Sequence, residues 1–278
     1  MKTVISASRR TDIPAFYLDW FIDRINQGVV EVRNPFYPQN TKRVSLTPDQ
    51  VEWIVFWSRN YGHFLKKRQS FEAYQLFFHF TIVSPSILEK SPMPIARQLN
   101  QLEQLVNIYG AQRIIWRYDP LVFWRQGSNL NTNFSEKEFE FLAKTITGFG
   151  IKSCTISVAH PYAKFEKRLK NKFPQLTLIE QQDDFVLKTV SKLLDIEQYY
   201  HLEIKACCTD FLLKNHNIHK AACIDGHLLN QLSSNKVSEA KTPTRPECVC
   251  TKSIDIGDYR RQPCYFGCLY CYANPVWK

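Results

Sequence analysis

Short apolar runs alternate with amphipathic stretches along most of this chain, and that alternation limits the folds it can adopt. The runs are mostly rich in β-branched or aromatic residues and lack a two-residue alternation, which is typical of strands buried on both faces. The expected strands are Thr3–Ser8, Val29–Arg33, Trp53–Ser58, Leu76–Val83, Arg113–Tyr118, Ser153–Val158, Leu202–Ala206 and Ala221–Ile224. Eight strands alternating with helices predict an α/β fold of the TIM-like (β/α)8 barrel type, and a doubly wound open sheet gives a similar pattern.

Two capping boxes mark expected helix starts between these strands. One spans Thr47 to Gln50 and has a proline at the first helical position. The other begins at Ser135 and is followed by Phe139, Leu142 and Ile146 at helical spacing.

A change of composition after Leu232 marks the expected end of the barrel. Residues 233–247 are polar and punctuated by proline, which is typical of a linker or of a segment that follows the surface. Residues 248–278 are too few to build a core, so they need a metal or the barrel surface to become ordered. We therefore expect a barrel domain over 1–232, a linker over 233–247, and a cysteine-rich tail over 248–278 that folds over the barrel mouth.

The chain carries no signal for a membrane or for export. The apolar run in its first ten residues is too short for a signal peptide, and no stretch approaches the roughly 20 apolar residues of a membrane helix. We expect a cytoplasmic protein with no membrane partner. The formal net charge of +10 is spread along the chain, which favours a solvated basic surface over a nucleic-acid partner.

Nine cysteines are present, and five of them lie in the last 31 residues. In a reducing cytosol such clustering favours metal or cluster binding over disulfides. Cys264, Cys268 and Cys271 have C-x3-C-x2-C spacing, which lets three thiolates from one tight loop reach three corners of an iron–sulfur cubane. Gly267 allows the backbone to fold close to the cluster, and aromatic neighbours such as Tyr270 shield it from water. Three ligands leave one iron for a fourth cysteine or a small molecule.

The remaining cysteines leave alternatives open. Cys248 and Cys250 either supply a fourth ligand or, with Cys208 and Cys223, hold a second cluster. Cys208 and Cys223 are also compatible with a buried core position. A zinc staple is the alternative for the whole tail, with tetrahedral ligands from Cys248, Cys250, Cys268 and Cys271.

Polar side chains follow most of the expected strands. In a barrel the carboxyl ends of the strands meet at one mouth, so we expect these side chains to converge there. The expected anion-binding residues are Arg9, Arg10, Arg33 and Asn34, and the expected catalytic residues are Asp12, Arg117 and Asp119. A guanidinium fork matches a carboxylate or phosphate, which predicts a small anionic substrate. Pairing with arginine would keep the two aspartates ionised and suits an orienting role. The alternative is that the arginines cap helices or pair with carboxylates.

The tail resembles the radical S-adenosylmethionine (SAM) enzymes. Their signature is C-x3-C-x-aromatic-C, and Cys264, Cys268, Tyr270 and Cys271 match it. The resemblance implies a [4Fe–4S] cluster whose open iron is chelated by SAM, an electron donor, and a full or partial α/β barrel. Here the motif follows the last expected strand, so the tail would fold back to present its cluster.

A second resemblance extends over nearly the whole chain. It rests on residues 6–14, 33–35, 116–120 and 223–225 together with the tail. These segments resemble the bacterial family of domain of unknown function 1848, which is described by a C-terminal cysteine cluster similar to the radical SAM one. The resemblance implies the fold and the cluster, and it names no reaction.

Two functions of different class follow. The first is a radical SAM-type enzyme that acts on a small anionic substrate at the barrel mouth. The second is a non-catalytic iron–sulfur protein for electron transfer or sensing, or one associated with nucleic acid, or a zinc-stapled barrel. Replacing Arg117 or Asp119 should abolish turnover under the first and should matter little to cluster content under the second.

Overall fold

The computed structural model describes residues 1–90 and 92–277 and divides the chain into two compact units. The first unit comprises residues 1–80, 93–114 and 222–264, and the second lies within 81–92, 115–221 and 265–278. Each unit is assembled from three stretches of chain. The boundary between the last two stretches falls directly after Cys264, inside the cysteine triplet.

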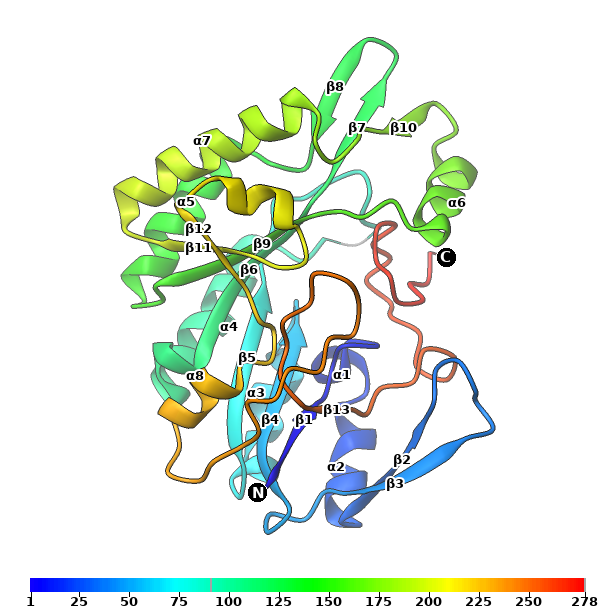
Figure 1. Ribbon diagram of the computed structural model, residues 1–278, viewed down its shortest axis with the longest axis vertical. Helices are drawn as coiled ribbons and strands as arrows, with labels where there is room; N and C mark the ends of the chain where they lie inside the picture. Colours follow the sequence, from blue (N-terminus) through cyan, green and yellow to red (C-terminus); the bar gives the residue numbers. More distant parts are fainter. Residues whose placement is uncertain (91, 278) are drawn as a thin grey trace. The chain divides into compact units, whose positions relative to one another are not determined.

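The first unit is built around four parallel strands in the order β5-β4-β1-β13 (Figure 1). Its strands and helices are β1 (Thr3–Ser6), α1 (Ile13–Phe16), α2 (Leu18–Asn26), β2 (Val29–Arg33), β3 (Thr41–Ser45), β4 (Val51–Ser58), α3 (Gly62–Lys67), β5 (Gln75–Thr81), α4 (Ile95–Tyr109), α8 (Gly226–Gln231) and β13 (Ile254–Asp255). Two short 3-10 helices, η1 (Arg68–Phe71) and η2 (Ala111–Arg113), complete it. Strand β4 is buried over almost its whole length, as expected for a strand covered on both faces.

Aromatic side chains fill the core of the first unit. Phe56 from β4 contacts Phe21 of α2, Phe64 of α3 and Phe71, and Phe78 from β5 contacts Phe56 and Phe64, with ring centroids between 5.3 and 6.0 Å. All five side chains are fully buried. Rings at such spacings add edge-to-face attraction to their area burial, so this cluster holds α2 and α3 on the sheet.

The second unit contains four further parallel strands in the order β12-β11-β9-β6. Its elements are β6 (Ile114–Leu121), β7 (Phe123–Gln126), β8 (Asn129–Thr132), α5 (Glu136–Gly148), β9 (Ser153–Val158), α6 (Ala163–Lys172), β10 (Leu176–Leu178), α7 (Asp184–Tyr200), β11 (Glu203–Ala206), the 3-10 helix η3 (Asp210–Lys214) and β12 (Ile218–Lys220). Strands β10, β7 and β8 form a small antiparallel sheet. Helices α5 and α7 lie side by side (Figure 1).

The capping box at Ser135 is confirmed. The Ser135 side chain accepts a hydrogen bond from the Glu138 amide at the start of α5. Phe139, the first core residue of the helix, lies between Trp116 and Tyr118 of β6, with ring centroids 5.2 and 4.9 Å away. The cap and the buried face agree on one helix.

The capping box at Thr47 was expected to begin a helix, and that prediction is wrong. Residues 47–50 form a turn, in which the Gln50 amide donates to the Thr47 carbonyl, and β4 begins at Val51. The residues after the box are mainly β-branched and aromatic and are buried on both faces of the strand. Burial of that run outweighs a local start signal of about 1 kcal/mol.

The eight sheet strands together give an α/β fold with a large parallel sheet. No pairing that would close this sheet into a barrel is found within residues 1–90 and 92–277. Two expected strands are not members of the large sheet: Val29–Arg33 pairs antiparallel with β3, and Ala221–Ile224 follows β12 without strand structure. The two sheet strands that were not predicted are β12, beside β11, and β13, beside β1. Strands of three and two residues give weak sequence signals.

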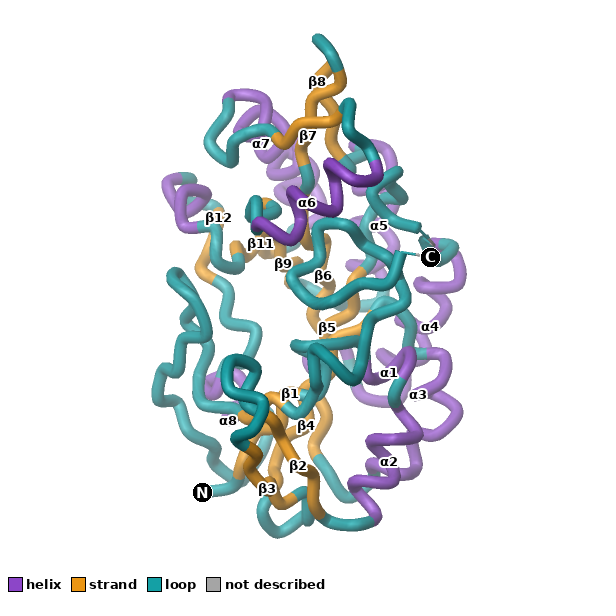
Figure 2. Tube along the Cα trace, turned by 90° about the vertical axis from the view of Figure 1, so that its right-hand side faces the viewer, coloured by secondary structure: helices purple, strands orange, loops and turns teal. Residues whose placement is uncertain are grey.

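After β13 the described chain continues to residue 277 without a further helix or strand (Figure 2). The predicted linker 233–247 is attached to the first unit, where Ser233 and Asn235 hydrogen-bond the Glu52 carboxylate. Among the described residues, no helix has the length and apolar character needed to cross a membrane.

Candidate functional site

Part of the cysteine triplet lies in an apolar cluster of the second unit. Cys268, Leu269 and Tyr270 are buried. Their buried neighbours in this cluster are Leu88, Val122, Trp124, Phe165, Leu169 and Leu176. An apolar surrounding excludes water and sets the potential of a bound cluster, so the position of Cys268 fits the expected ligand role.

The chain approaches Cys268 through a tight backbone contact. Residues 88–90 pair with the triplet, since the Leu269 amide donates to the Leu88 carbonyl at 2.9 Å and Glu89 forms an antiparallel bridge with Cys268. Gly267 has φ +67°, and a Cβ atom there would stand 2.7 Å from the Lys90 Cβ atom. Only glycine fits this position without strain.

Arg168 of α6 holds the loop around Cys271. Its guanidinium donates to the carbonyls of Leu269 at 2.9 Å, of Ala273 at 3.4 Å, and of Cys271. Burial lowers the pKa of Arg168, while charges on Cys271 and Cys268 act to raise it. The cation is therefore placed where thiolate charge would develop.

Tyr270 points its hydroxyl to a carboxylate within the same unit. It hydrogen-bonds Glu89, and both residues are more than nine-tenths buried. The aromatic position of the motif is thus fixed by a polar contact as well as by packing against Phe165, whose ring centroid is 6.5 Å away.

Cys264 is the last residue of the first unit and precedes Cys268 by four positions. It is half-buried, as is Cys271. In the described part of the chain, no three His, Cys, Asp or Glu side chains are grouped as a metal site. The case for a metal on the triplet therefore rests on chain spacing, thiol chemistry and the surroundings of Cys268 and Cys271.

Three more thiols are linked to one another in the first unit. The Cys250 side chain shares hydrogen bonds with Cys223 and with Cys248. The hydrogen bond with Cys223, together with burial, raises the pKa of Cys250. Burial acts to raise the pKa of Cys248, but hydrogen bonds from Thr244 and Cys250 outweigh it and the net direction is downward. Cys208 follows β11 in the second unit.

Asp12 caps α1 at the end of the loop that follows β1. Its carboxylate accepts from the Ala15 amide at 3.0 Å, from the Arg59 amide at 3.2 Å, and from the Ser58 hydroxyl at 2.8 Å. Burial raises the pKa of Asp12 to about 7 despite these hydrogen bonds. The expectation that arginine pairing keeps Asp12 ionised is wrong, because neutral donors dominate and the arginine charge contributes least.

Arg117 and Asp119 lie together in the second unit. Arg117 Nη2 and Asp119 Oδ2 are 2.5 Å apart, and the Asp119 carboxylate also accepts from the Ser157 hydroxyl of β9. Arg117 is buried, whereas Asp119 is partly exposed. The two predicted catalytic residues thus form an ion pair, the arrangement that the alternative interpretation of the arginines described.

The expected anion-binding residues all belong to the first unit. Arg9 pairs with Asp255 at 3.6 Å and lies over the Trp57 ring. Arg10 donates to the carbonyls of Arg33 and Gly257, which are neutral partners.

Arg33 and Asn34 lie at the end of β2 in the β2–β3 hairpin, not at the end of a strand of the large sheet. Asn34 is exposed, and its side chain accepts from the amides of Phe36 and Tyr37 in the turn.

The structure thus brings together Arg117 with Asp119, Arg10 with Arg33, and Cys250 with Cys223 and Cys248. Residues that the sequence did not single out include Arg168, Glu89 and Ser157. Arg168 sits in the basic run of α6, where nothing local distinguishes it from its exposed neighbours. Only the fold shows that it reaches the cysteine loop.

Comparison with known families gives one match over most of the chain. Residues 4–273 match the family model described as Domain of unknown function (DUF1848). No curated protein matches the sequence.

Proposed function

The chain belongs to the DUF1848 family, and we propose that it binds a [4Fe–4S] cluster through Cys264, Cys268 and Cys271. We propose further that it is a radical SAM-type enzyme acting on a small anionic substrate. The observation that carries the proposal is the environment of Cys268 and Cys271, which combines an apolar cluster with the Arg168 guanidinium.

The donor set fits such a cluster. Three thiols fall within eight consecutive residues, so the chain itself keeps them within reach of one cubane. Gly267 lies between the first two cysteines and has a positive φ, which turns the loop sharply. At this turn the backbone passes close to Lys90. Thiolate ligation gives a cluster net negative charge, and the Arg168 cation beside Cys271 compensates part of it.

When bound, a cluster of this type with SAM supplies an electron that cleaves SAM and starts radical chemistry. The protein's own residues exclude water, position groups and hold charge. The apolar cluster around Leu269 keeps water from Cys268, and the Tyr270–Glu89 contact fixes the loop.

The surroundings of Arg10 support an anionic substrate, because its hydrogen-bond acceptors carry no net charge. Arg10 donates to backbone carbonyls, which do not neutralise the guanidinium. One of these carbonyls belongs to Arg33, so Arg33 lies next to Arg10. Asp12, with a pKa raised to about 7, suits proton transfer near neutral pH rather than a purely orienting role.

Further parts of the proposal concern fold and partners. We propose that the large parallel sheet is curved toward a barrel, since the order of its strands follows the chain and the last strand, β13, pairs with the first, β1. A reduced electron donor and a cytoplasmic location go with a reducible cluster in a chain whose described cysteines form no disulfide.

The test is electron paramagnetic resonance of the anaerobically purified and reduced protein, with and without SAM. The proposal predicts a [4Fe–4S]⁺ signal that changes when SAM is added. The matched control is Cys154→Ala, a buried thiol of β9 whose loss should leave the signal intact. A cluster signal that ignores SAM at saturating concentration would leave an iron–sulfur protein and remove the radical SAM assignment.

A further inference from the structure

Cys223, Cys248 and Cys250 form a second group of thiols, separate in sequence from the triplet. The Cys250 side chain shares hydrogen bonds with both of the others, so three sulfurs follow one another in a chain. All three residues belong to the first unit. Thiols in such direct contact are close enough for bond formation between sulfurs after small rotations of the side chains.

The backbones that carry Cys223 and Cys250 run next to each other. The Thr251 amide donates to the Ile224 carbonyl at 2.9 Å, and the Gly226 amide donates to Thr251 Oγ1 at 2.9 Å. Each cysteine is the residue directly before one member of the Thr251–Ile224 pair. The Ile224 backbone also hydrogen-bonds the Cys250 sulfur. The hydrogen bond between Thr251 and Ile224 thus keeps the two cysteines on neighbouring backbones, which a disulfide between them requires.

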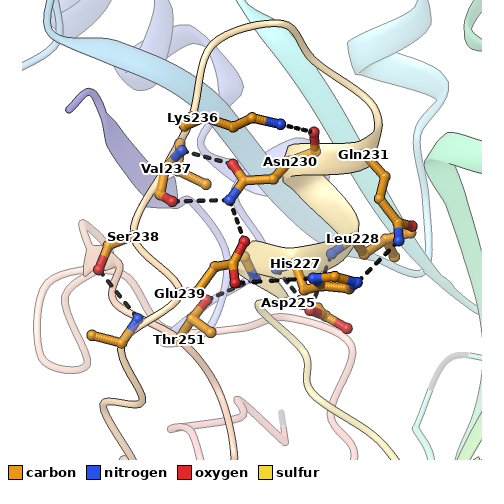
Figure 3. A network of polar contacts seen from close by, with 12 residues as sticks. Asp225, His227, Leu228, Asn230, Gln231, Lys236, Val237, Ser238, Glu239 and Thr251 are labelled. Atoms are coloured by element: carbon orange, nitrogen blue, oxygen red, sulfur yellow. Dashed lines mark hydrogen bonds and ion pairs between the residues drawn. The ribbon is translucent and has the colours of Figure 1, made fainter.

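A polar network fixes this arrangement around α8 (Figure 3). The Asn230 side chain donates to the Val237 carbonyl at 3.1 Å and to Glu239 at 2.7 Å, and it accepts from the Val237 amide at 2.7 Å. A Cβ atom at Gly226 would lie 2.5 Å from the Ser238 carbonyl oxygen, so this segment touches the start of α8 directly. The segment that leads to Cys248 and Cys250 is therefore held against the segment that follows Cys223.

The three thiols differ in their access to solvent. Cys250 is only 4% exposed, whereas Cys248 is half-buried and its contact with the Thr244 hydroxyl, at 3.6 Å, is exposed. Cys223 is half-buried, and its carbonyl accepts from the His79 ring. A small reagent thus reaches Cys248 on the surface, and Cys250 lies between it and Cys223.

We propose that Cys223, Cys248 and Cys250 form a thiol–disulfide exchange site, in which Cys248 receives oxidation from a small disulfide and the product is a Cys223–Cys250 disulfide. The Cys248 sulfur attacks the small disulfide, whose S–S bond breaks and releases one thiol. Cys250 then attacks Cys248 and releases the second thiol. Finally Cys223 attacks Cys250, and the Cys248 thiol is restored.

The exchange balances. Two protein thiols are oxidised to one disulfide, and one small disulfide is reduced to two thiols that take the two protons. A bond between Cys248 and Cys250, only two residues apart, closes a short ring with strained geometry, so it passes readily to Cys223. The final bond joins segments that the Asn230 network already holds together.

The test treats the full-length, anaerobically purified protein with oxidised glutathione, followed by alkylation of remaining thiols and peptide mapping without reduction. The expected product is a Cys223–Cys250 cross-link, two mass units lighter than the reduced pair and reversed by dithiothreitol. In Cys248→Ser the same link should form about tenfold more slowly, because the exposed entry thiol is gone. In Cys223→Ser glutathione or a Cys248–Cys250 link should accumulate. Cys208→Ser is the matched control and should behave as the wild type.

Full alkylation of Cys223 and Cys250 after oxidation would overturn the site. So would equal rates in the wild type and Cys248→Ser. Metal that copurifies with the wild type, is absent from Cys223→Ser and Cys250→Ser, and blocks cross-linking would assign these thiols to a metal instead. None of these outcomes depends on the triplet, since its iron content is measured separately on the same samples.

Discussion

The two groups of thiols differ in the partners that surround them. In the first unit the hydrogen bond with Cys223, burial and the Cys223 charge raise the pKa of Cys250, and the Arg9 charge is a lesser, opposing influence. In the second unit Cys268 and Cys271 lie beside Arg168, and negative charge on these two sulfurs acts to raise the pKa of its guanidinium. The raised pKa of Cys250 means that this buried sulfur keeps its proton, whereas the lowered pKa of Cys248 and the cation beside Cys271 both favour thiolate.

This difference in surroundings shows that cysteine spacing alone does not define the chemistry of a site. Cys248 and Cys250 are as close in sequence as any pair in the tail, but their environment suits exchange among thiols. The triplet has an environment that suits thiolates bound to a metal. Carboxylates depend on their surroundings in the same way. Asp12 is buried among neutral donors, and its pKa rises to about 7.

Arg168→Ala should give the largest effect. Three carbonyls around Cys271 would lose a charged donor, which should lower the free energy of unfolding by about 4 kcal/mol and expose the tail to proteases. Lys170→Ala, an exposed cation on the same helix, should change stability by less than about 0.5 kcal/mol. Urea unfolding and limited proteolysis measure both variants. Equal effects of the two substitutions would contradict the role of Arg168 in holding the loop around Cys271.

Asp12→Asn should change the pH dependence of stability. The folded pKa, about 7, lies above the ordinary value of 3.8, so the folded state binds more protons between these values. The contribution of Asp12 is fully present below pH 3.8 and is lost as the pH rises to about 7. The wild type should lose about 1 kcal/mol per pH unit in this window relative to the variant. Urea unfolding from pH 4.5 to 7.5 measures the difference, and parallel curves would contradict it.

Gly267→Ala should cost about 2 kcal/mol more than Gly127→Ala. Both glycines have positive φ, so both variants carry the strain of an alanine there. A Cβ at Gly267 would also clash with Lys90 at 2.7 Å, whereas nothing lies within 4 Å at Gly127. Thermal and urea unfolding of the two variants isolate the close approach. Equal costs would mean that the loop between the cysteines relaxes freely.

Tyr270→Phe should give the smallest effect. It keeps the ring in the apolar cluster and removes the hydroxyl that hydrogen-bonds Glu89. The expected loss is about 1 kcal/mol in the free energy of unfolding, with iron content unchanged. Tyr272→Phe, on a more exposed ring, is the control. Loss of iron in Tyr270→Phe would show that the contact positions the cysteine loop.

The strands of the large sheet were predictable wherever burial and composition agreed. Ser153–Val158 was predicted with its bounds, and β1, β4, β5, β6 and β11 within a few residues. Val29–Arg33 was also predicted with its bounds, but it pairs in a hairpin and not in the large sheet, which its own residues do not reveal. Strands β12 and β13 were missed, because strands of three and two residues leave little apolar pattern. The Thr47 and Ser135 boxes show that a start signal needs a matching periodic face.

The sequence indicated which residues belong to the candidate site, but it did not indicate which other residues they contact. The sequence singled out Arg117 and Asp119, and the structure joins them in an ion pair. It did not indicate that Asp12 would be buried among neutral donors, which depends on Ser58 and Arg59 some 46 residues away. Long-range contacts decide protonation, and a single sequence carries no direct record of them.

The most direct measurement is iron and acid-labile sulfide per chain after anaerobic purification, with a visible absorption spectrum. Three proteins are compared: the wild type, Cys264→Ala/Cys268→Ala/Cys271→Ala, and the matched control Cys223→Ala/Cys248→Ala/Cys250→Ala, each checked for folding by circular dichroism. The account predicts about four irons and four sulfides in the wild type and the control, and almost none in the triplet variant. Colourless wild-type protein with stoichiometric zinc, or iron lost only from the control, would contradict it.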